Sequence, residues 1–341
     1  MRLKPKLILY WIAGIIVVLF ALFIADYFLY PHFSKVGGRS FNIGQNASWL
    51  NDSWYLGKAK ESPKQLAGQL TQHQIRYAYF HVRYIKKDGT LRFHNATAAS
   101  RLTEAMHHDS PKIKSIAWIY IGNARGLTGV DIGNARVRKN IVQQVIWLIA
   151  ECGFDGVQLD YEICANGDKN FLTLLKQTRH AMPKGKLLSV ATSMWGTAPF
   201  YSFYWSEKYF SQVVANCDQI AVMCYDSGVY LPRLYVWLMR QQAIRVTRAT
   251  AQGNPQCRVQ LGIPTCEDGG PSHHPYTENI YLAMKGVREG LSNPNANLSA
   301  FEGVAIFGNY TTDAEEWRTY ENLWLNQKGK SDAKEKDNHS N

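Results

Sequence analysis

The segment Gly156-Val157-Gln158-Leu159-Asp160-Tyr161-Glu162 decides the fold of this 341-residue chain. Side chains alternate faces along a strand, so the three apolar residues share one face and Gln158, Asp160 and Glu162 share the other. Polar groups on a covered face are costly unless they are paired or used. The segment therefore predicts a strand that packs its apolar face on outer helices and points its polar face into a barrel.

The same alternation of strand and helix extends along the chain in both directions. Short apolar runs predict eight strands, at 49–56, 75–82, 113–121, 156–162, 187–191, 219–225, 259–263 and 304–307. Amphipathic stretches predict a helix after each of them, at 63–73, 97–107, 136–152, 170–181, 207–217, 234–249, 278–289 and 313–324. A doubly wound open sheet also fits this order, but eight repeats over residues 48–326 favour an α/β fold of the (β/α)8 TIM barrel type.

An apolar segment precedes this domain. Leu7–Ala25 holds 19 residues without a charge, after Arg2, Lys4 and Lys6, which is close to the length that spans a bilayer core. We expect residues 1–31 to form a cytoplasmic stub and a single transmembrane helix, with the catalytic domain on the extracytoplasmic side because basic residues stay inside. A cleaved signal peptide is the alternative. Residues 32–47 are then a linker, and 327–341 are expected to be a disordered polar tail.

Composition limits the partners and cofactors. The net charge is +11, but the basic residues are scattered, so anionic polymers or lipids are favoured over nucleic acid. None of the six cysteines forms a CxxC pair, and no phosphate-binding loop occurs, so we expect no cofactor and no metal. His273 and His274 lack further ligands at defined spacing. Cys217 and Cys257 both precede predicted strands and are candidates for a disulfide. We expect a monomer.

The acidic strand predicts acid chemistry at the barrel mouth. Glu162 ends the strand, where catalytic residues of such barrels lie, and Asp160 is one step deeper. Two carboxylates this close do not readily ionise together, so one pKa should be raised, as a general acid at neutral pH requires. An inert, hydrogen-bonded polar plug is the alternative. His81, after the second predicted strand, either faces the mouth or is a satisfied core histidine.

Two motifs resemble a known family. Asp155–Glu162 resembles the Asp-Gly-x-Asp-x-Asp-x-Glu motif of glycoside hydrolase family 18, the chitinase-like enzymes, and Met223-Cys224-Tyr225-Asp226 resembles its Met-x-Tyr-Asp motif. Gln260–Pro264 is a weaker echo on the seventh strand. The order and the strand-end positions agree over roughly residues 48–325, and together the two motifs are specific.

The resemblance implies roles for the matching residues. Glu162 is expected to protonate the glycosidic oxygen, Asp160 to orient the substrate's N-acetyl group, and Tyr225 to steady the acetamido oxygen that attacks the anomeric carbon. Asp226 and Met223 are expected to contact substrate. The implied activity is cleavage of β-1,4 bonds next to N-acetylglucosamine, with peptidoglycan ahead of chitin because of the anchor and the positive charge.

Two departures from the family pattern keep other functions open. Gln158 replaces the middle Asp; it can hydrogen-bond to Asp160 and should leave Asp160 more readily ionised. The family usually ends its eighth strand with a Trp that forms the floor of the central sugar subsite, and Phe307 stands nearest to that position here. Trp195 and Tyr310 are the alternatives for this role. A lectin-like, catalytically impaired relative is therefore one alternative. A two-carboxylate glycosidase with Asp160 or Asp226 as nucleophile is another.

Overall fold

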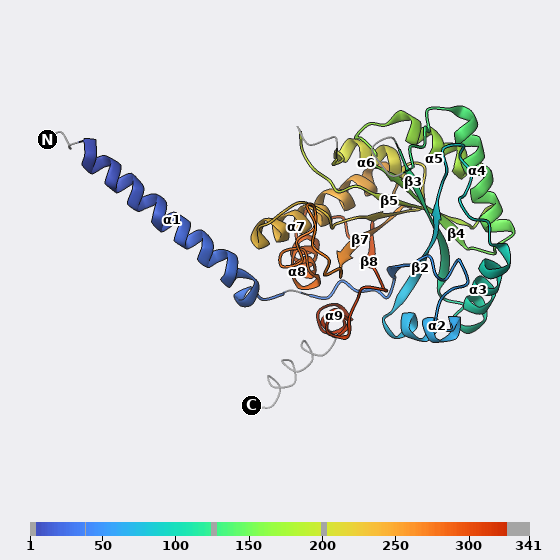
Figure 1. Cartoon of the computed structure of the whole chain (residues 1–341), viewed down its shortest axis with the longest axis horizontal. Coiled ribbons are helices and arrows are strands. Elements are labelled where there is room, and N and C mark those ends of the chain that lie inside the picture. The colour runs from blue at the N-terminus through green and yellow to red at the C-terminus, as the bar shows by residue number, and fades with distance from the viewer. Residues whose placement is uncertain (1–4, 38, 124–127, 199–202, 326–341) are drawn as a thin grey trace.

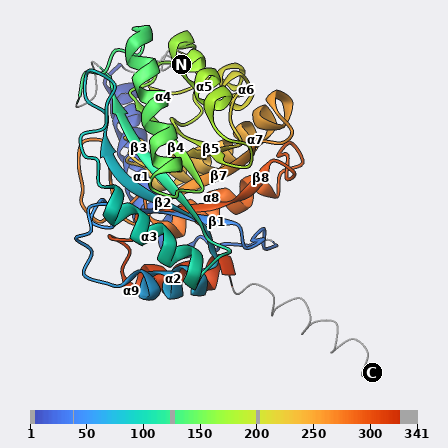
Figure 2. The ribbon, with the colours of Figure 1, turned by 90° about the vertical axis from the view of Figure 1, so that its right-hand side faces the viewer.

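Eight parallel strands close into a barrel in the computed structural model of the chain, with helices around it (Figures 1 and 2). The structure describes residues 5–37, 39–123, 128–198 and 203–325. Residues 1–4 of the predicted stub and the predicted tail at 327–341 lie outside this part. The strands pair in chain order, and β1 closes on β8, which confirms the (β/α)8 barrel and excludes the open sheet.

The strands are β1 Asn46–Leu50, β2 Ile75–Tyr84, β3 Lys114–Gly122, β4 Gly156–Glu162, β5 Leu187–Thr192, β6 Gln219–Val222, β7 Arg258–Pro264 and β8 Phe301–Phe307. The helices are α1 Pro5–Phe33, α2 Pro63–Gln72, α3 Ala96–Asp109, α4 Ala135–Ala150, α5 Lys169–Ala181, α6 Glu207–Val214, α7 Pro232–Gly253, α8 Ile280–Leu291 and α9 Ala314–Tyr320, followed by the π-helical turn η1 Glu321–Leu325.

The bounds of several predicted elements differ from those in the structure, and three of these differences have a clear cause. The first strand was expected at 49–56 but occupies Asn46–Leu50; the aromatic residues that follow belong to a turn, where Tyr55 is buried and its hydroxyl donates to the Phe93 carbonyl oxygen. The sixth strand ends at Val222, although extended chain continues to the site residues. The last helix is α-helical only to Tyr320. Burial by tertiary packing gave loop residues the apolar signature of strands.

Two apolar clusters form the core. The larger one lies between the strands and the surrounding helices. The smaller one fills the barrel with Trp49, Tyr79, Ile116, Tyr225 and three alanines. Below this inner cluster the barrel is polar. There Glu302 accepts hydrogen bonds from Tyr77, Gln219 and Gln260, at 2.7, 2.8 and 3.2 Å. The barrel is therefore a packed interior with its open end at the carboxyl ends of the strands.

The apolar N-terminal segment forms a long helix that stands away from the barrel (Figure 1). Within the described residues, Tyr10–Phe33 is the one stretch long and apolar enough to cross a membrane, and it is not buried in the protein. A helix with these properties is either a membrane span or a signal sequence, as the sequence indicated.

The two cysteines expected to be neighbours do lie together. The sulfur atoms of Cys217 and Cys257 are 4.0 Å apart and buried at the bottom of the barrel. They form no disulfide, and the other four cysteines are also free thiols. The expected disulfide is therefore not present in this structure, although the expected adjacency is.

Candidate active site

β4 carries the three polar side chains of the decisive segment on its inward face, as alternation predicted. Their depth increases away from the mouth: Gln158 is fully buried, Asp160 is 2% exposed, and Glu162 is partly exposed at the end of the strand. The pairing of β3 with β4 places Trp118 beside Gln158 and Gly122 beside Glu162. Of the three, Glu162 is the one that lines the pocket at the barrel mouth.

Gln158 is held by partners other than the one expected. Its side-chain oxygen accepts a hydrogen bond from the indole N–H of Trp49 at 2.7 Å, and its amide N–H donates to the Ser189 hydroxyl at 3.1 Å. Neither contact involves Asp160, so the hydrogen bond that Gln158 could make to Asp160 is not among them. The hydrogen bonds of Gln158 match the alternative given above for the acidic strand, a hydrogen-bonded polar plug in the barrel.

Asp160 is a buried acid with one satisfied oxygen. Its Oδ2 accepts a hydrogen bond from the Trp118 indole N–H at 2.8 Å, while Oδ1 is buried without a hydrogen-bond partner. Burial, and then the charge of Glu162, hold the pKa of Asp160 well above its usual range, against the opposing effect of Trp118. The expectation that Gln158 would leave Asp160 readily ionised is thus outweighed by burial.

Glu162 lines a pocket of about 630 Å³ at the barrel mouth. Burial raises the pKa of Glu162, and the charge of Asp226 raises it further. A carboxyl group whose pKa is raised and which faces a pocket has the features of a general acid. The pocket wall also includes Met194, Phe203, Tyr204, Met223, Tyr225, Asp226, Gly228, Pro271 and Ser272.

Tyr225 stands between this pocket and the inner core. Its ring stacks on Phe307 with centroids 4.1 Å apart and an interplanar angle of 13°, and Trp49 meets it edge-on at 6.1 Å. Burial and the nearby charges of Asp160 and Glu162 raise its pKa well above the usual range, so the phenol keeps its proton. A neutral, fixed phenol near Glu162 is a hydrogen-bond donor for a substrate oxygen.

Asp226 is positioned by a residue that sequence reasoning missed. Its backbone has a left-handed conformation, with φ of 55°, and its side chain is 56% exposed toward the pocket. The buried carboxylate of Glu278 accepts hydrogen bonds from the backbone N–H groups of Asp226 and Ser227, both at 2.9 Å, and from the Ser227 hydroxyl. His273 Nδ1 contacts the same carboxylate at 2.8 Å.

Asp226, His273 and Glu278 together bring possible metal-ligand atoms within 4.8 Å of one another. The sequence did not suggest this group because its members come from the loops after β6 and β7. Glu278 is already occupied by four hydrogen-bonding groups, and His273 Nε2 contacts the Cys266 carbonyl oxygen at 2.8 Å. These contacts describe a polar network that fixes the chain around Asp226.

The remaining aromatic candidates lie outside the pocket wall. Trp195 is buried in the outer core, where its backbone N–H donates to Gln242 Oε1 at 2.6 Å and Arg245 lies over its ring. Phe307 is covered on one face by Tyr225. His81 stacks on Trp118 with centroids 4.3 Å apart, and burial lowers its pKa to about 4, so it is neutral at pH 7.

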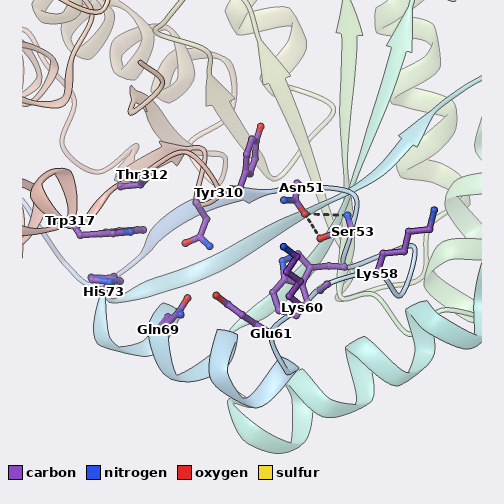
Figure 3. Close-up of a pocket in the computed structure, with 13 residues that line it drawn as sticks. Asn51, Ser53, Lys58, Lys60, Glu61, Gln69, His73, Tyr310, Thr312 and Trp317 are labelled. Carbon is purple, nitrogen blue, oxygen red and sulfur yellow. Dashed lines mark hydrogen bonds between the residues drawn. The ribbon is translucent and has the colours of Figure 1, made fainter. Parts of the chain in front are cut away.

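A second pocket of about 650 Å³ lies between the chain after β1 and the chain after β8 (Figure 3). Tyr310 lines it, and so do Trp54 and the stacked pair of His73 and Trp317, whose centroids are 3.9 Å apart. Polar side chains complete the wall, among them Asn51, Lys58, Lys60 and Glu61. Tyr310 lies three residues after Phe307, whose ring stacks on Tyr225, so this pocket is near the site at Glu162.

Comparison with known proteins shows the family of this chain. The family model described as glycosyl hydrolases family 18 matches residues 52–335. Among curated proteins there is no significant match. Solved structures share the fold at low identity. The spore cortex-lytic enzyme SleL of Bacillus cereus has 14% identity and a TM-score of 0.58, with 85% of this chain and 76% of that chain covered.

Two chitinases are similar in the same way. The Group IV chitinase of Ostrinia furnacalis has 14% identity and a TM-score of 0.56, with 82% of this chain and 99% of that chain covered. A class V chitinase mutant of Cycas revoluta, solved with (GlcNAc)3, has 16% identity and a TM-score of 0.54, with 82% and 99% covered.

Proposed function

Since the chain belongs to glycosyl hydrolase family 18, we propose that it cleaves β-1,4 bonds next to N-acetylglucosamine in a glycan by substrate-assisted, retaining catalysis. One observation carries this proposal: Glu162 faces a pocket and has a raised pKa, while Asp160 and Tyr225 lie fixed beside it and also have raised pKa values. The pocket thus offers an acid and hydrogen-bond donors.

In the proposed first step, Glu162 gives its proton to the glycosidic oxygen as the bond to the anomeric carbon breaks. The acetamido oxygen of the substrate attacks that carbon and forms a cyclic oxazolinium ion. Tyr225 donates a hydrogen bond to this acetamido oxygen, and Asp160 orients the acetamido N–H. Glu162, now a carboxylate, then takes a proton from the water that opens the ring.

We propose peptidoglycan as the natural polymer, with the chain anchored by α1 and its N-terminus in the cytoplasm. The positive net charge of +11 favours an anionic wall polymer. Solved structures that share this fold include a spore cortex-lytic enzyme as well as chitinases. Two flanking pockets, at Glu162 and at Tyr310, suit a glycan that extends across the mouth.

Glu162→Gln tests the acid. The amide keeps the shape of the side chain but has no proton to give, so release of reducing ends from a GlcNAc hexamer and from peptidoglycan should fall by about 10²–10⁴-fold. Glu104→Gln, an exposed change on α3, is the matched control and should be fully active. Equal rates for wild type and Glu162→Gln would remove Glu162 from the mechanism.

The same preparation separates the alternatives. Binding of GlcNAc oligomers by the wild type without turnover would assign a lectin-like function. A covalent glycosyl-enzyme trapped on Asp160 or Asp226 would assign a protein nucleophile. Strong inhibition by a thiazoline analogue of GlcNAc is the expected result, because this analogue mimics the cyclic intermediate of substrate-assisted catalysis.

A further inference from the structure

Exposed apolar side chains gather where α7 and α8 begin. Tyr230 is 60% exposed, Leu234 45%, Trp237 47% and Tyr276 39%. Leu234 and Trp237 are three residues apart on α7 and so share one face of the helix. We call Tyr230, Leu234, Trp237 and Tyr276, together with Arg233, the α7 surface. Such a group of large apolar side chains on a folded domain indicates a partner.

The end of α1 lies against this surface. Asp26 accepts a hydrogen bond from Arg233 Nε at 3.0 Å and a second one from the same guanidinium group. The ring of Tyr27 stacks on Tyr276 with centroids 5.0 Å apart, and the guanidinium carbon of Arg233 is 4.2 Å from the ring centre of Tyr30. The last two turns of the helix are therefore docked on the barrel.

The chain after α1 is also held rather than free. The Tyr281 hydroxyl donates to the Ser34 carbonyl oxygen, and Lys285 Nζ donates to the Lys35 carbonyl oxygen at 2.9 Å. Tyr281 and Lys285 are one turn apart on α8, so the chain passes along this helix on its way to β1 (Figure 1). The helix is thus attached beside the starts of α7 and α8.

This attachment point is on the active-site side of the barrel. Each helix of the barrel follows a strand, so helix N-termini lie at the edge where the strands end and the pocket opens. The loops that carry Tyr230 and Tyr276 also supply Gly228, Pro271 and Ser272 to the wall of the Glu162 pocket. The α7 surface and the pocket therefore belong to the same end of the molecule.

The charged residues of α1 indicate where this helix would cross the membrane–water interface. The uncharged run closes at Asp26, and Tyr27 and Tyr30 follow it, a pattern that marks the membrane–water interface. Arg233 and Tyr276 contact these very residues and so lie at the same height. Trp, Tyr and Arg are the side chains that suit lipid headgroups, since each combines an apolar body with a polar tip.

We propose that the α7 surface rests on the lipid headgroups of the membrane that α1 spans, which holds the Glu162 pocket beside the bilayer. The inference depends on the proposed anchor but not on the proposed chemistry. The partner is the lipid surface itself, because the surface is continuous with the end of the membrane helix. The positive net charge favours anionic lipid.

Fluorescence quenching in nanodiscs tests the contact. The full chain, with Cys266→Ser because the other five cysteines are buried, would carry one NBD-labelled cysteine at position 237 or, as a matched control, at exposed Lys64 on α2. The discs contain phosphatidylcholine, phosphatidylglycerol and a lipid with a doxyl group near its head. We expect quenching at position 237 to exceed that at position 64 by about threefold or more.

Each outcome has a separate meaning. Equal quenching at the two positions, in discs that do contain the chain, would overturn the proposal. Protection of position 237 that requires two copies per disc would overturn it in favour of a second copy as partner. A chain that elutes without the disc would contradict the anchor, and with it the lipid contact, but would say nothing about Glu162.

A release variant tests whether the docked end of α1 holds the α7 surface at the membrane. Asp26→Asn with Tyr276→Ala removes the ion pair to Arg233 and the stacked ring. We expect this variant to stay in the disc while the quenching at position 237 falls to the level of position 64. Unchanged quenching in the release variant would support the lipid contact and show that the α7 surface makes it without the docked end of α1.

Discussion

Asp160 carries an electrostatic cost that only its function explains. It is buried, one of its oxygens has no hydrogen-bond partner, and its pKa is held well above the usual range by burial and by Glu162. A carboxyl group in such a place destabilises the fold when it ionises. Residues of this kind concentrate at active sites, where stability is given up for chemistry.

Asp160→Asn should therefore stabilise the protein in a pH-dependent way. The unfolded chain releases the Asp160 proton above about pH 4, whereas the folded protein holds it to higher pH. The stabilisation that comes from the proton bound to Asp160 is fully present below pH 4. It is lost as the pH rises through the pKa that Asp160 has in the folded protein. Relative to wild type, the free energy of unfolding of the variant should rise across this window, by about 1–3 kcal/mol at neutral pH.

Urea unfolding of the wild type and of Asp160→Asn between pH 4 and pH 8 measures this difference. Activity should be lost at the same time, because the amide no longer supports the acetamido group. A stability difference that is the same at every pH would mean that the ionisation of Asp160 carries no such cost.

Glu278 makes a prediction of a different kind, since it touches no substrate in the proposed mechanism. It is a positioning residue that fixes the backbone N–H groups of Asp226 and Ser227. Glu278→Gln replaces one acceptor oxygen by a donor that faces these N–H groups. Displacement of Asp226 should lower kcat about 10–100-fold with a smaller change in KM. Glu289→Gln, on the exposed side of α8, is the control.

A purely structural role for Glu278 would show itself differently. Stability would fall while kcat of the folded fraction stayed at the wild-type level. A positioning role predicts instead that Glu278→Asp, which keeps the carboxylate, retains more of kcat than Glu278→Gln. Steady-state kinetics together with a thermal melt of each variant separate the two cases.

The bounds of β4 were predicted correctly, and in the structure close packing against neighbouring strands fixes where β4 begins. It begins at Gly156, where a side-chain carbon would lie 2.2 Å from the Leu187 carbonyl oxygen on β5. The elements at β1, β6 and α9 are each followed by buried aromatic residues, in irregular chain after β1 and β6 and in the π-helical turn η1 after α9. A sequence pattern reports burial, and it cannot tell whether a strand or a packed loop is buried.

Gly156→Ala should destabilise the barrel by about 1–3 kcal/mol, since β4 and β5 would have to separate locally. Gly68→Ala on α2 is a matched control, because nothing lies within 4 Å of the added carbon and alanine favours the helix. The midpoints of chemical unfolding compare the two variants. Similar midpoints would mean that the close approach at Gly156 is easily relaxed.

The whole molecule combines a rigid barrel with a helix that is docked at its active-site end. This arrangement gives α1 an orientation relative to the pocket, which a free linker would not. The sequence predicted the helix and the domain as separate units joined by residues 32–47, and the contacts of Ser34 and Lys35 with α8 could not be foreseen from it.

Membrane topology is the prediction at this scale. In sealed, right-side-out membrane vesicles, added protease should remove the barrel domain, while a tag placed before Arg2 should stay protected. Carbonate washing should leave the chain in the membrane, as expected for a spanning helix. A mature chain that starts after Ala25 and is released into the soluble fraction would establish the cleaved signal peptide instead.

The sequence by itself determined the barrel, its acidic strand β4 with Glu162 at the end, and the place of Tyr225 and Asp226 in the chain that follows β6. It could do so because strand alternation and motif order are local properties of the chain. The tertiary structure alone decided that Gln158 bonds to Trp49 and Ser189, that burial sets the pKa of Asp160, and that Glu278 holds Asp226. Those partners come from distant strands and loops, and the desolvation that they cause depends on the closed barrel around them.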